Sequence, residues 1–188
     1  MDLKQYKTDC LRTESPTDSV VVNELLLGST LQQIKSLGRI LDQIKKHVFY
    51  GKAYNSGAMA QDIELAAEGM KTMQTLTHDE IENKEYDVGI DPRVFHAVVG
   101  VATESVELLE ALRFHHTPMD LVNMREEGGD ICWYLSILLD AAGGDWDTVL
   151  TNNIDKLRAR YPEKFTSEDA INRNLDAERT ILENGASQ

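Results

Sequence analysis

The sequence lacks the features that would stabilise a small secreted protein or anchor a chain in a membrane. It has only two cysteines, Cys10 and Cys132, too few to suggest a disulfide framework. The N-terminal stretch MDLKQYKTDC has no apolar signal core, and no hydrophobic run reaches the length that spans a bilayer. We therefore expect a soluble protein of a reducing compartment, the cytoplasm, with no membrane partner. Because Cys132 lies inside an apolar run, we expect its thiol to be buried and inert.

Positive charge is also scarce. The chain has 19 Lys and Arg against 32 Asp and Glu, a formal net charge of −13, and a sequence pI near 4.7. Binding nucleic acid through its phosphates needs clustered Lys and Arg, so we expect no nucleic-acid partner. An acidic protein can still bind a phosphorylated small molecule through a metal ion and a few local cations.

Proline and strand signals are rare as well. Only four prolines interrupt the chain, and the one cluster of β-branched residues, at 20–22, is too short to matter. Helix boundaries are expected at Pro92, at Gly143–Gly144 and at Thr166, which would cap a helix together with Asp169. The spacing of apolar residues predicts helices at about 2–13, 21–48, 58–83, 93–114, 120–142, 145–160 and 166–183. The predicted fold class is all-α, a helical bundle forming a single domain over residues 1–188.

Two pairs of carboxylates stand out in the predicted helices. Glu104 and Glu107 are one turn apart, and Glu127 and Asp130 repeat that spacing in the next helix. The second pair shares an apolar stripe with Ile131, Tyr134 and Leu138. On that stripe we expect Asp130 to be the least hydrated of the four acids. Four carboxylates on adjacent antiparallel helices repel one another and lose hydration, so a cation must compensate them.

A hard divalent ion is the natural candidate for that cation. Magnesium prefers oxygen ligands, keeps several waters and is commonly shared with substrate phosphates, and Mn²⁺ would be able to replace it. No Glu-x-x-His occurs in the chain, which disfavours a ferritin-like di-iron site. The predicted magnesium ligands are Glu104, Glu107, Glu127 and Asp130. The alternative interpretation is a non-enzymatic helical scaffold in which these acids are solvated surface groups.

These motifs carry a resemblance to a known family. Glu104-x-x-Glu107, a spacer of 19 residues and Glu127-x-x-Asp130 resemble the signature of the MazG-like all-α nucleotide pyrophosphohydrolases. The resemblance to the phage-encoded branch covers about 90 residues, through DPRVFHAVVGVATESVELLEAL, DLVNMREEGGDICWYLSILL and NNIDKLRARYPEKFTSEDAINRNLDAER. The family usually has a bulky apolar residue where Gly128 stands, so the segment EEGGD departs from the pattern.

The resemblance implies both a fold and an activity. The fold would be the bundle of the all-α NTP pyrophosphohydrolases, with catalytic helices at 93–160 and a C-terminal helix and tail at 166–188. The activity would be magnesium-dependent hydrolysis of nucleoside triphosphates to monophosphate and pyrophosphate, with purine deoxynucleotides such as dGTP or dATP as one candidate class. A dUTPase-like or phosphoribosyl-ATP pyrophosphohydrolase activity stays open, because the same metal site serves those reactions. The phage-encoded branch also implies the cytoplasm of the host.

The resemblance further implies roles for individual residues. The carboxylates of Glu107 and Glu104 would be catalytic, with Glu107 as the expected acceptor of a proton from the attacking water. Asn153, Lys156 and Arg160 lie on one helix face at i, i+3 and i+7. Lys156 and Arg160 would contact the triphosphate, and Asn153 would support them in this substrate-binding set. Members of the superfamily usually dimerise or tetramerise, so we expect a homo-oligomer with active sites near the subunit contacts.

The N-terminal helices at 21–83 allow two interpretations. Residues 40–69 can be aligned with residues 108–130, and this register pairs Ser36 with Glu104, Arg39 with Glu107, Asp62 with Glu127 and Leu65 with Asp130. The first interpretation is an eroded internal copy that lost its metal site and kept its packing face. The second is an unrelated helical hairpin.

Overall fold

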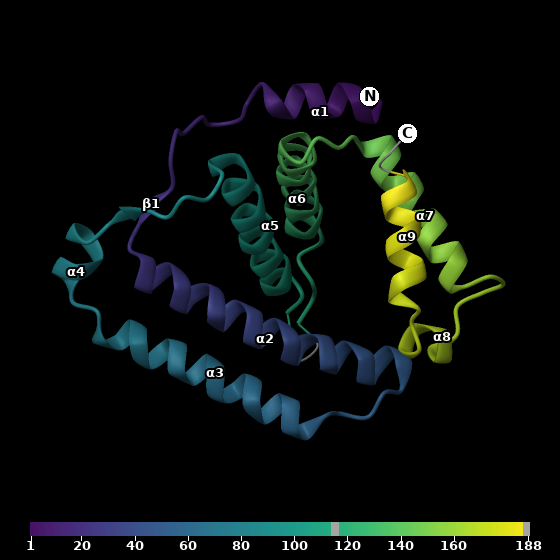
Figure 1. The fold of residues 1–188 in the computed structure, drawn as a ribbon, viewed down its shortest axis with the longest axis horizontal. Helices are drawn as coiled ribbons and strands as arrows, with labels where there is room; N and C mark the ends of the chain where they lie inside the picture. The colour runs from purple at the N-terminus through teal and green to yellow at the C-terminus, as the bar shows by residue number, and fades with distance from the viewer. Residues whose placement is uncertain (114–116, 186–188) are drawn as a thin grey trace. The chain divides into compact units, whose positions relative to one another are not determined.

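A computed structural model describes residues 1–113 and 117–185, and it confirms the all-α fold class. Its helices are α1 (Leu3–Leu11), α2 (Glu24–Tyr50), α3 (Ser56–Thr75), α4 (His78–Asn83), α5 (Pro92–Ala111), α6 (Leu121–Ala141), α7 (Trp146–Arg160), α8 (Ser167–Ile171) and α9 (Leu175–Gly185). The only strands in these residues are β1 (Val21–Val22) and β2 (Tyr86–Asp87), which pair antiparallel. The β-branched cluster at 20–22 thus contributes one short pairing to an otherwise helical chain (Figure 1).

Local capping explains where the helices begin and end. Asp91 accepts a hydrogen bond from the Val94 N–H, and Pro92 occupies the first position of α5 as predicted. The chain leaves α6 through Gly143, whose φ of 70° lies in the left-handed region. Two predicted helices are interrupted, because Thr77 forms a capping box that starts α4 and Thr166 caps a short α8 that ends before residue 172. The segments 58–83 and 166–183 are therefore each divided into two helices.

The chain forms two compact units. Unit 1 comprises Met1–Val20, Gly89–Ile154 and the end of the chain from Glu183. Unit 2 comprises Val21–Val88 and Asp155–Leu182, so the boundary between the units falls within α7 and again within α9. The predicted catalytic helices lie mostly in unit 1, and the predicted N-terminal helices lie in unit 2.

Unit 1 is built on the hairpin of α5 and α6, with α1 packed against α6 (Figure 1). The two helices approach closely at Gly100, where an added Cβ would lie only 2.2 Å from the ring of Tyr134. Ala97 and Ile137 are fully buried in this hairpin. A small residue on α5 is therefore what admits the aromatic ring of α6 between the helices.

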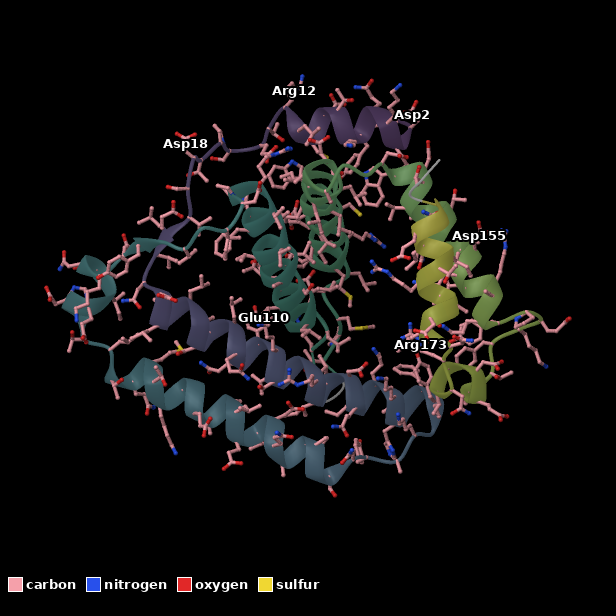
Figure 2. The ribbon with its side chains drawn as sticks, in the orientation of Figure 1. Asp2, Arg12, Asp18, Glu110, Asp155 and Arg173 are labelled. Carbon is pink, nitrogen blue, oxygen red and sulfur yellow. The ribbon has the colours of Figure 1, made fainter. Side chains whose placement is uncertain are left out.

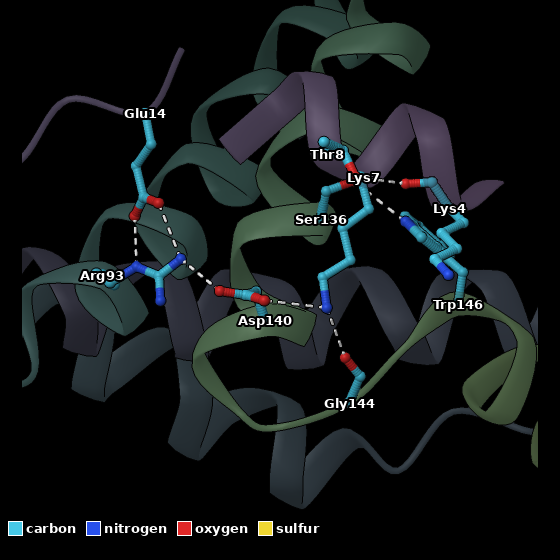
Figure 3. Close-up of polar contacts among 9 residues, drawn as sticks. All are labelled: Lys4, Lys7, Thr8, Glu14, Arg93, Ser136, Asp140, Gly144 and Trp146. Atoms are coloured by element: carbon cyan, nitrogen blue, oxygen red, sulfur yellow. Dashed lines mark hydrogen bonds and ion pairs between the residues drawn. The ribbon is translucent and has the colours of Figure 1, made fainter. Parts of the chain in front are cut away.

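An ion-pair network ties α1 and the segment after it to the hairpin of unit 1 (Figure 3). Arg93 binds Glu14 through Nε at 2.8 Å and Asp140 through Nη2 at 2.8 Å. Lys7 binds Asp140 at 3.0 Å and donates to the carbonyl of Gly144 at 2.9 Å. The cations of Arg93 and, secondarily, Lys7 hold the pKa of Asp140 below its usual value. Since Asp140 bridges both cations, it joins α1, α5 and the end of α6.

Unit 2 is built on a second hairpin, of α2 and α3, with α8 packed against α2. Its most buried ion pairs converge on Glu178 of α9, whose side chain is 8% exposed. Arg160 donates from Nε to Glu178 at 2.8 Å, and Arg173 donates from Nε at 3.3 Å. Arg173, between α8 and α9, is labelled in Figure 2. The two guanidiniums, Arg173 first, lower the pKa of Glu178 to about 2.

The α2–α3 hairpin has an ion pair at positions that the internal register aligns with the acids of α5 and α6. Arg39 donates from Nε to Asp62 at 2.6 Å and from Nη2 to the Ser36 hydroxyl at 3.3 Å. Ser36 is fully buried and Asp62 is 6% exposed. In the register, Arg39 corresponds to Glu107, Asp62 to Glu127 and Ser36 to Glu104. The positions that carry the acids in unit 1 thus carry a guanidinium bound to a carboxylate in unit 2, where Arg39 itself supplies the positive charge. The internal copy stays a prediction.

Candidate metal centre

Three of the four predicted ligands meet between α5 and α6. Glu104 of α5 and Glu127 and Asp130 of α6 each offer a carboxylate oxygen, and these oxygens all lie within 4.8 Å of one another. The i, i+3 spacing on α6 places Glu127 and Asp130 one turn apart, and the hairpin brings Glu104 to them from the facing helix. We call Glu104, Glu127 and Asp130 the acidic cluster.

Glu127 is the buried member of the acidic cluster. It is 4% exposed, whereas Glu104 is half-buried and Asp130 is exposed. Burial raises the pKa of Glu127, and so do a hydrogen bond with Glu104 and the negative charges of Glu104, Glu126 and Asp130. The ionised form of Glu127 therefore needs a cation close to it.

The expectation that Asp130 is the least hydrated acid is wrong. At about 100° per residue, Glu127 lies on the line through Ile131, Tyr134 and Leu138, whereas Asp130 is rotated about 60° away from it. Asp130 accordingly lies at the exposed edge of the cluster. Cys132 is rotated about 140° from the same line, and its thiol is exposed rather than buried, whereas Cys10 is buried.

Glu107, the fourth predicted ligand, stays outside the acidic cluster. It is exposed, one turn after Glu104 on α5. Its charge nevertheless acts on Tyr134: burial raises the pKa of Tyr134, and the charges of Glu104, Asp130 and Glu107 raise it further. Glu107 thus borders the cluster without contributing an oxygen to it.

Two tyrosines lie beside the acidic cluster, and the sequence analysis assigns neither of them a functional role. Tyr134 comes from α6, and its ring is admitted by Gly100. Tyr6 comes from α1: burial, a hydrogen bond with Cys10 and nearby negative charge, including that of Asp130, raise its pKa to about 12. Tyr134 is seven residues after Glu127, and this spacing predicts that both side chains lie on the same side of the helix. The position of Tyr6 depends on the approach of α1 to α6, which the local sequence does not predict.

The double glycine after Glu127 does not break the helix. α6 runs from Leu121 to Ala141 through Gly128 and Gly129, and a Cβ added at either glycine would meet nothing within 4 Å. The Tyr6 hydroxyl donates to the carbonyl of Gly129 at 3.3 Å, so α1 contacts α6 at this turn. Open space therefore lies beside Gly128, directly after Glu127 of the acidic cluster.

The chemistry of the acidic cluster fits a hard divalent cation. Three carboxylates supply oxygen donors from two helices, which is the ligand type that magnesium prefers. The buried charge of Glu127, repelled by its neighbours, gives the apo protein a reason to take up such an ion. Oxygen donors of this kind also suit Mn²⁺, so the donor type does not distinguish Mn²⁺ from Mg²⁺.

A cavity of unit 1 lies away from the acidic cluster. It measures about 450 Å³ and is lined by α1 and by residues from Asp140 to Asp147, including Trp146. Asp140 is ten residues after Asp130, which corresponds to about 15 Å along the axis of α6. Trp146 donates to Ser136 at 3.1 Å, so its indole N–H is already bound.

The predicted phosphate contacts are divided between the units. Asn153 lies on α7 in unit 1 and is half-buried, and Lys156 and Arg160 lie on the same helix in unit 2. All three residues lie in α7, which confirms that they share one helix. The guanidinium of Arg160 is bound to Glu178. Their contact with a triphosphate at the acidic cluster stays a prediction.

Comparisons with known proteins add no relative. No family model, curated protein or solved structure matches the chain. No helix among the described residues is sufficiently long and apolar to cross a bilayer.

Proposed function

We propose that the protein hydrolyses nucleoside triphosphates to monophosphate and pyrophosphate in a magnesium-dependent reaction. The observation that carries the proposal is the acidic cluster: the buried Glu127 has Asp130 one turn after it on α6 and Glu104 opposite it on α5. The resemblance of these helices to the MazG-like pyrophosphohydrolases supports the same reaction. Purine deoxynucleotides such as dGTP or dATP are the first substrates to test, and dUTP and phosphoribosyl-ATP are the alternatives.

The residues around the acidic cluster supply distinct functions in this proposal. Glu104, Glu127 and Asp130 would hold the ion, which when bound lowers the pKa of water and neutralises phosphate charge. Glu107 is exposed and outside the cluster, so its carboxylate is available to accept the proton of the attacking water. Phosphoryl transfer depends mainly on such positioning and charge neutralisation, and the chain offers both on one hairpin.

A nucleotide panel tests the proposal. Pyrophosphate release is measured with dGTP, dATP, dUTP and phosphoribosyl-ATP, each with Mg²⁺, with Mn²⁺ and with a chelator. We expect release that requires a divalent ion, and Glu127→Gln should lower kcat at least about a hundredfold, the scale of one lost electrostatic contact in an active site.

The matched control is Glu110→Gln, which removes an exposed carboxylate of the same helix α5 and is labelled in Figure 2. It should leave kcat within about twofold, because surface changes away from a site have small effects. Absence of pyrophosphate with every nucleotide, from a protein whose circular dichroism is helical, would reject the enzyme in favour of the scaffold interpretation.

A further inference from the structure

A second polar site lies in unit 2, and it is cationic rather than acidic. A cavity of about 260 Å³ opens between the C-terminal part of α2, the end of α7 and the α8 segment. Its lining includes five cationic side chains, which are Lys45, Lys46, Lys52, Arg160 and Arg173. We call it the basic pocket.

The formal charge of the basic pocket opposes that of the chain. Asp42 is the one acid in the lining, and Glu178, which is outside the lining, binds the two arginines. Five cations against these two carboxylates leave 5 − 2 = +3, in a chain whose net charge is −13. The C-termini of α2 and α7 each contribute about −0.5, so about +2 remains. A charge of this size matches a phosphate group, which carries about −1.5 to −2 at neutral pH.

The attraction of cations to helix C-termini does not account for all the cationic side chains of the basic pocket. Lysines near the end of α2 would interact favourably with its dipole, which accounts for Lys45 and Lys46. Arg173, however, comes from the segment between α8 and α9, and the chain after α2 brings Lys52 back into the same cavity. Gly51 makes this return possible with a φ of 67°, and the Lys52 N–H donates to the carbonyl of Lys46 at 3.2 Å.

The cations of the basic pocket differ in their freedom to bind a ligand. Arg160 and Arg173 are held in place by Glu178, and Lys45 and Lys46 share the carboxylate of Asp42. Lys52 is exposed and its ammonium makes no ion pair with any described residue. The pocket thus combines positioned guanidiniums, which suit the geometry of phosphate oxygens, with a lysine that is free to close on them.

Aromatic rings form part of the wall of the basic pocket. Tyr50 and Tyr161 line it, and both rings pack against Phe165, with centroid distances of 5.6 and 5.4 Å. The guanidinium of Arg160 lies 5.6 Å from the centroid of the Tyr161 ring. These ring contacts hold the aromatic side chains of the pocket wall in place beside its cationic side chains.

We propose that the basic pocket binds the phosphate group of a phosphorylated small molecule. The site lies entirely in unit 2 and uses no residue of the acidic cluster, and Arg160 is the one residue that it shares with the predicted triphosphate contacts. Its ligand chemistry is shared by free pyrophosphate and by nucleoside monophosphates, and binding requires no divalent ion.

Calorimetric titration of the full chain, freed of divalent ions on a chelating resin, tests the proposal. The probes are inorganic pyrophosphate, deoxyadenosine monophosphate and, as a non-phosphate anion, acetate, in about 0.15 M salt, where distant charges are screened. We expect saturable binding of one phosphate compound per chain and none of acetate. Tighter binding of the nucleotide would assign the site to nucleotides, and tighter binding of pyrophosphate would assign it to free polyphosphate.

Two pairs of substitutions complete the experiment. Lys45→Ala with Lys52→Ala should weaken binding about tenfold or more, because each removes a charge-assisted contact. Lys35→Ala with Lys71→Ala removes two exposed lysines of the same hairpin outside the pocket and should change it less than about twofold. Equal weakening by both pairs, or no saturable binding by the wild type, would overturn the proposal. Glu127→Gln should bind the probes like the wild type, which separates this result from the fate of the metal centre.

Discussion

At the scale of single residues, the burial of Glu127 is what distinguishes the acidic cluster from ordinary surface carboxylates. The residue is 4% exposed, and its neighbours add negative charge to a site that already disfavours ionisation of its carboxyl group. A buried charge of this kind costs stability unless a partner of opposite sign is present. If this residue holds the proposed metal ion, its burial links metal binding to the stability of the fold.

We predict that magnesium stabilises the wild type and that Glu127→Gln removes most of this effect. Ligand binding to the folded state raises its stability by mass action, whereas the amide keeps the shape of the side chain and cannot compensate a cation. Without magnesium the variant should be as stable as the wild type or more stable, because a repelled charge has gone. Melting temperatures with and without magnesium, for the wild type, Glu127→Gln and Glu110→Gln, measure both effects. Full magnesium stabilisation of Glu127→Gln would show that this residue is not a ligand.

Two glycines of the same hairpin should respond in opposite directions to alanine. Gly100→Ala places a Cβ 2.2 Å from Tyr134 and should destabilise the protein by about 1–3 kcal/mol, the usual cost of overpacking. Gly128→Ala meets nothing within 4 Å and should stabilise it by about 0.5–1 kcal/mol, because alanine loses less backbone entropy in a helix. Urea denaturation of both variants checks the signs. A stable Gly100→Ala protein would contradict the close approach of α5 and α6.

The residues of the acidic cluster show how far helical spacing predicts a site. Spacing correctly placed Glu127 and Asp130 on one side of α6 and Glu104 on the facing helix. Asp130 follows Glu127 by three residues and Tyr134 follows it by seven. The prediction about Asp130 treated these two positions as equivalent, although they differ by about 40° around the helix. The exclusion of Glu107 depends on how α5 is rotated against α6, and the sequence carries no local signal for that rotation.

At the scale of secondary-structure elements, capping residues predicted helix starts better than they predicted interruptions. Pro92 and Gly143 marked the expected boundaries of α5 and α6 because each restricts or requires a specific backbone conformation. The interruption between α3 and α4 contains neither proline nor glycine, and it arises where Leu76 is extended and Thr77 caps the next helix. The sequence feature that indicates this interruption is Thr77, a helix-capping residue inside an apolar helical pattern.

The attachment of α9 to α7 through Glu178 should depend on pH. Because the folded-state pKa is lowered to about 2 from 4.5, this carboxylate contributes stability that is present above about pH 4.5 and is lost as the pH falls toward 2. Glu178→Gln should destabilise the protein at pH 7 by about 3 kcal/mol, the lower end of the cost of removing one partner of a buried ion pair. Between pH 4.5 and 2 the variant should lose less stability than the wild type.

Denaturant unfolding at several pH values, followed by far-ultraviolet circular dichroism, measures this difference. Asp155→Asn is a suitable control, since Asp155 forms an ion pair with Arg158 that is exposed on both sides. Parallel pH profiles for the wild type and Glu178→Gln would contradict the assigned ion pairs with Arg160 and Arg173.

At the scale of the whole molecule, α2 carries an apolar stripe that the described residues leave exposed. The stripe consists of Ile34, Leu37, Leu41, Ile44 and Val48, whose exposed fractions range from 41% to 64%. Their spacing of three and four residues is the heptad pattern by which helices pair along a seam. The predicted homo-oligomer is therefore expected to use α2 as its contact, with a second copy of the same helix covering the stripe.

Sedimentation of two lysine variants tests this contact. Leu41→Lys places a charge in the stripe and should weaken self-association at least about tenfold, since burying a leucine contributes about 1.5–3 kcal/mol. Leu25→Lys is the matched control: Leu25 is 60% exposed on the same helix, and its separation of nine positions from Ile34 turns it about 180° away from that residue and off the stripe. The wild type and Leu25→Lys should sediment as dimers or tetramers at micromolar concentration, and Leu41→Lys as a smaller species. A monomeric wild type would instead require the stripe to be covered within one chain, which would remove the predicted oligomer while leaving the acidic cluster of α5 and α6 intact.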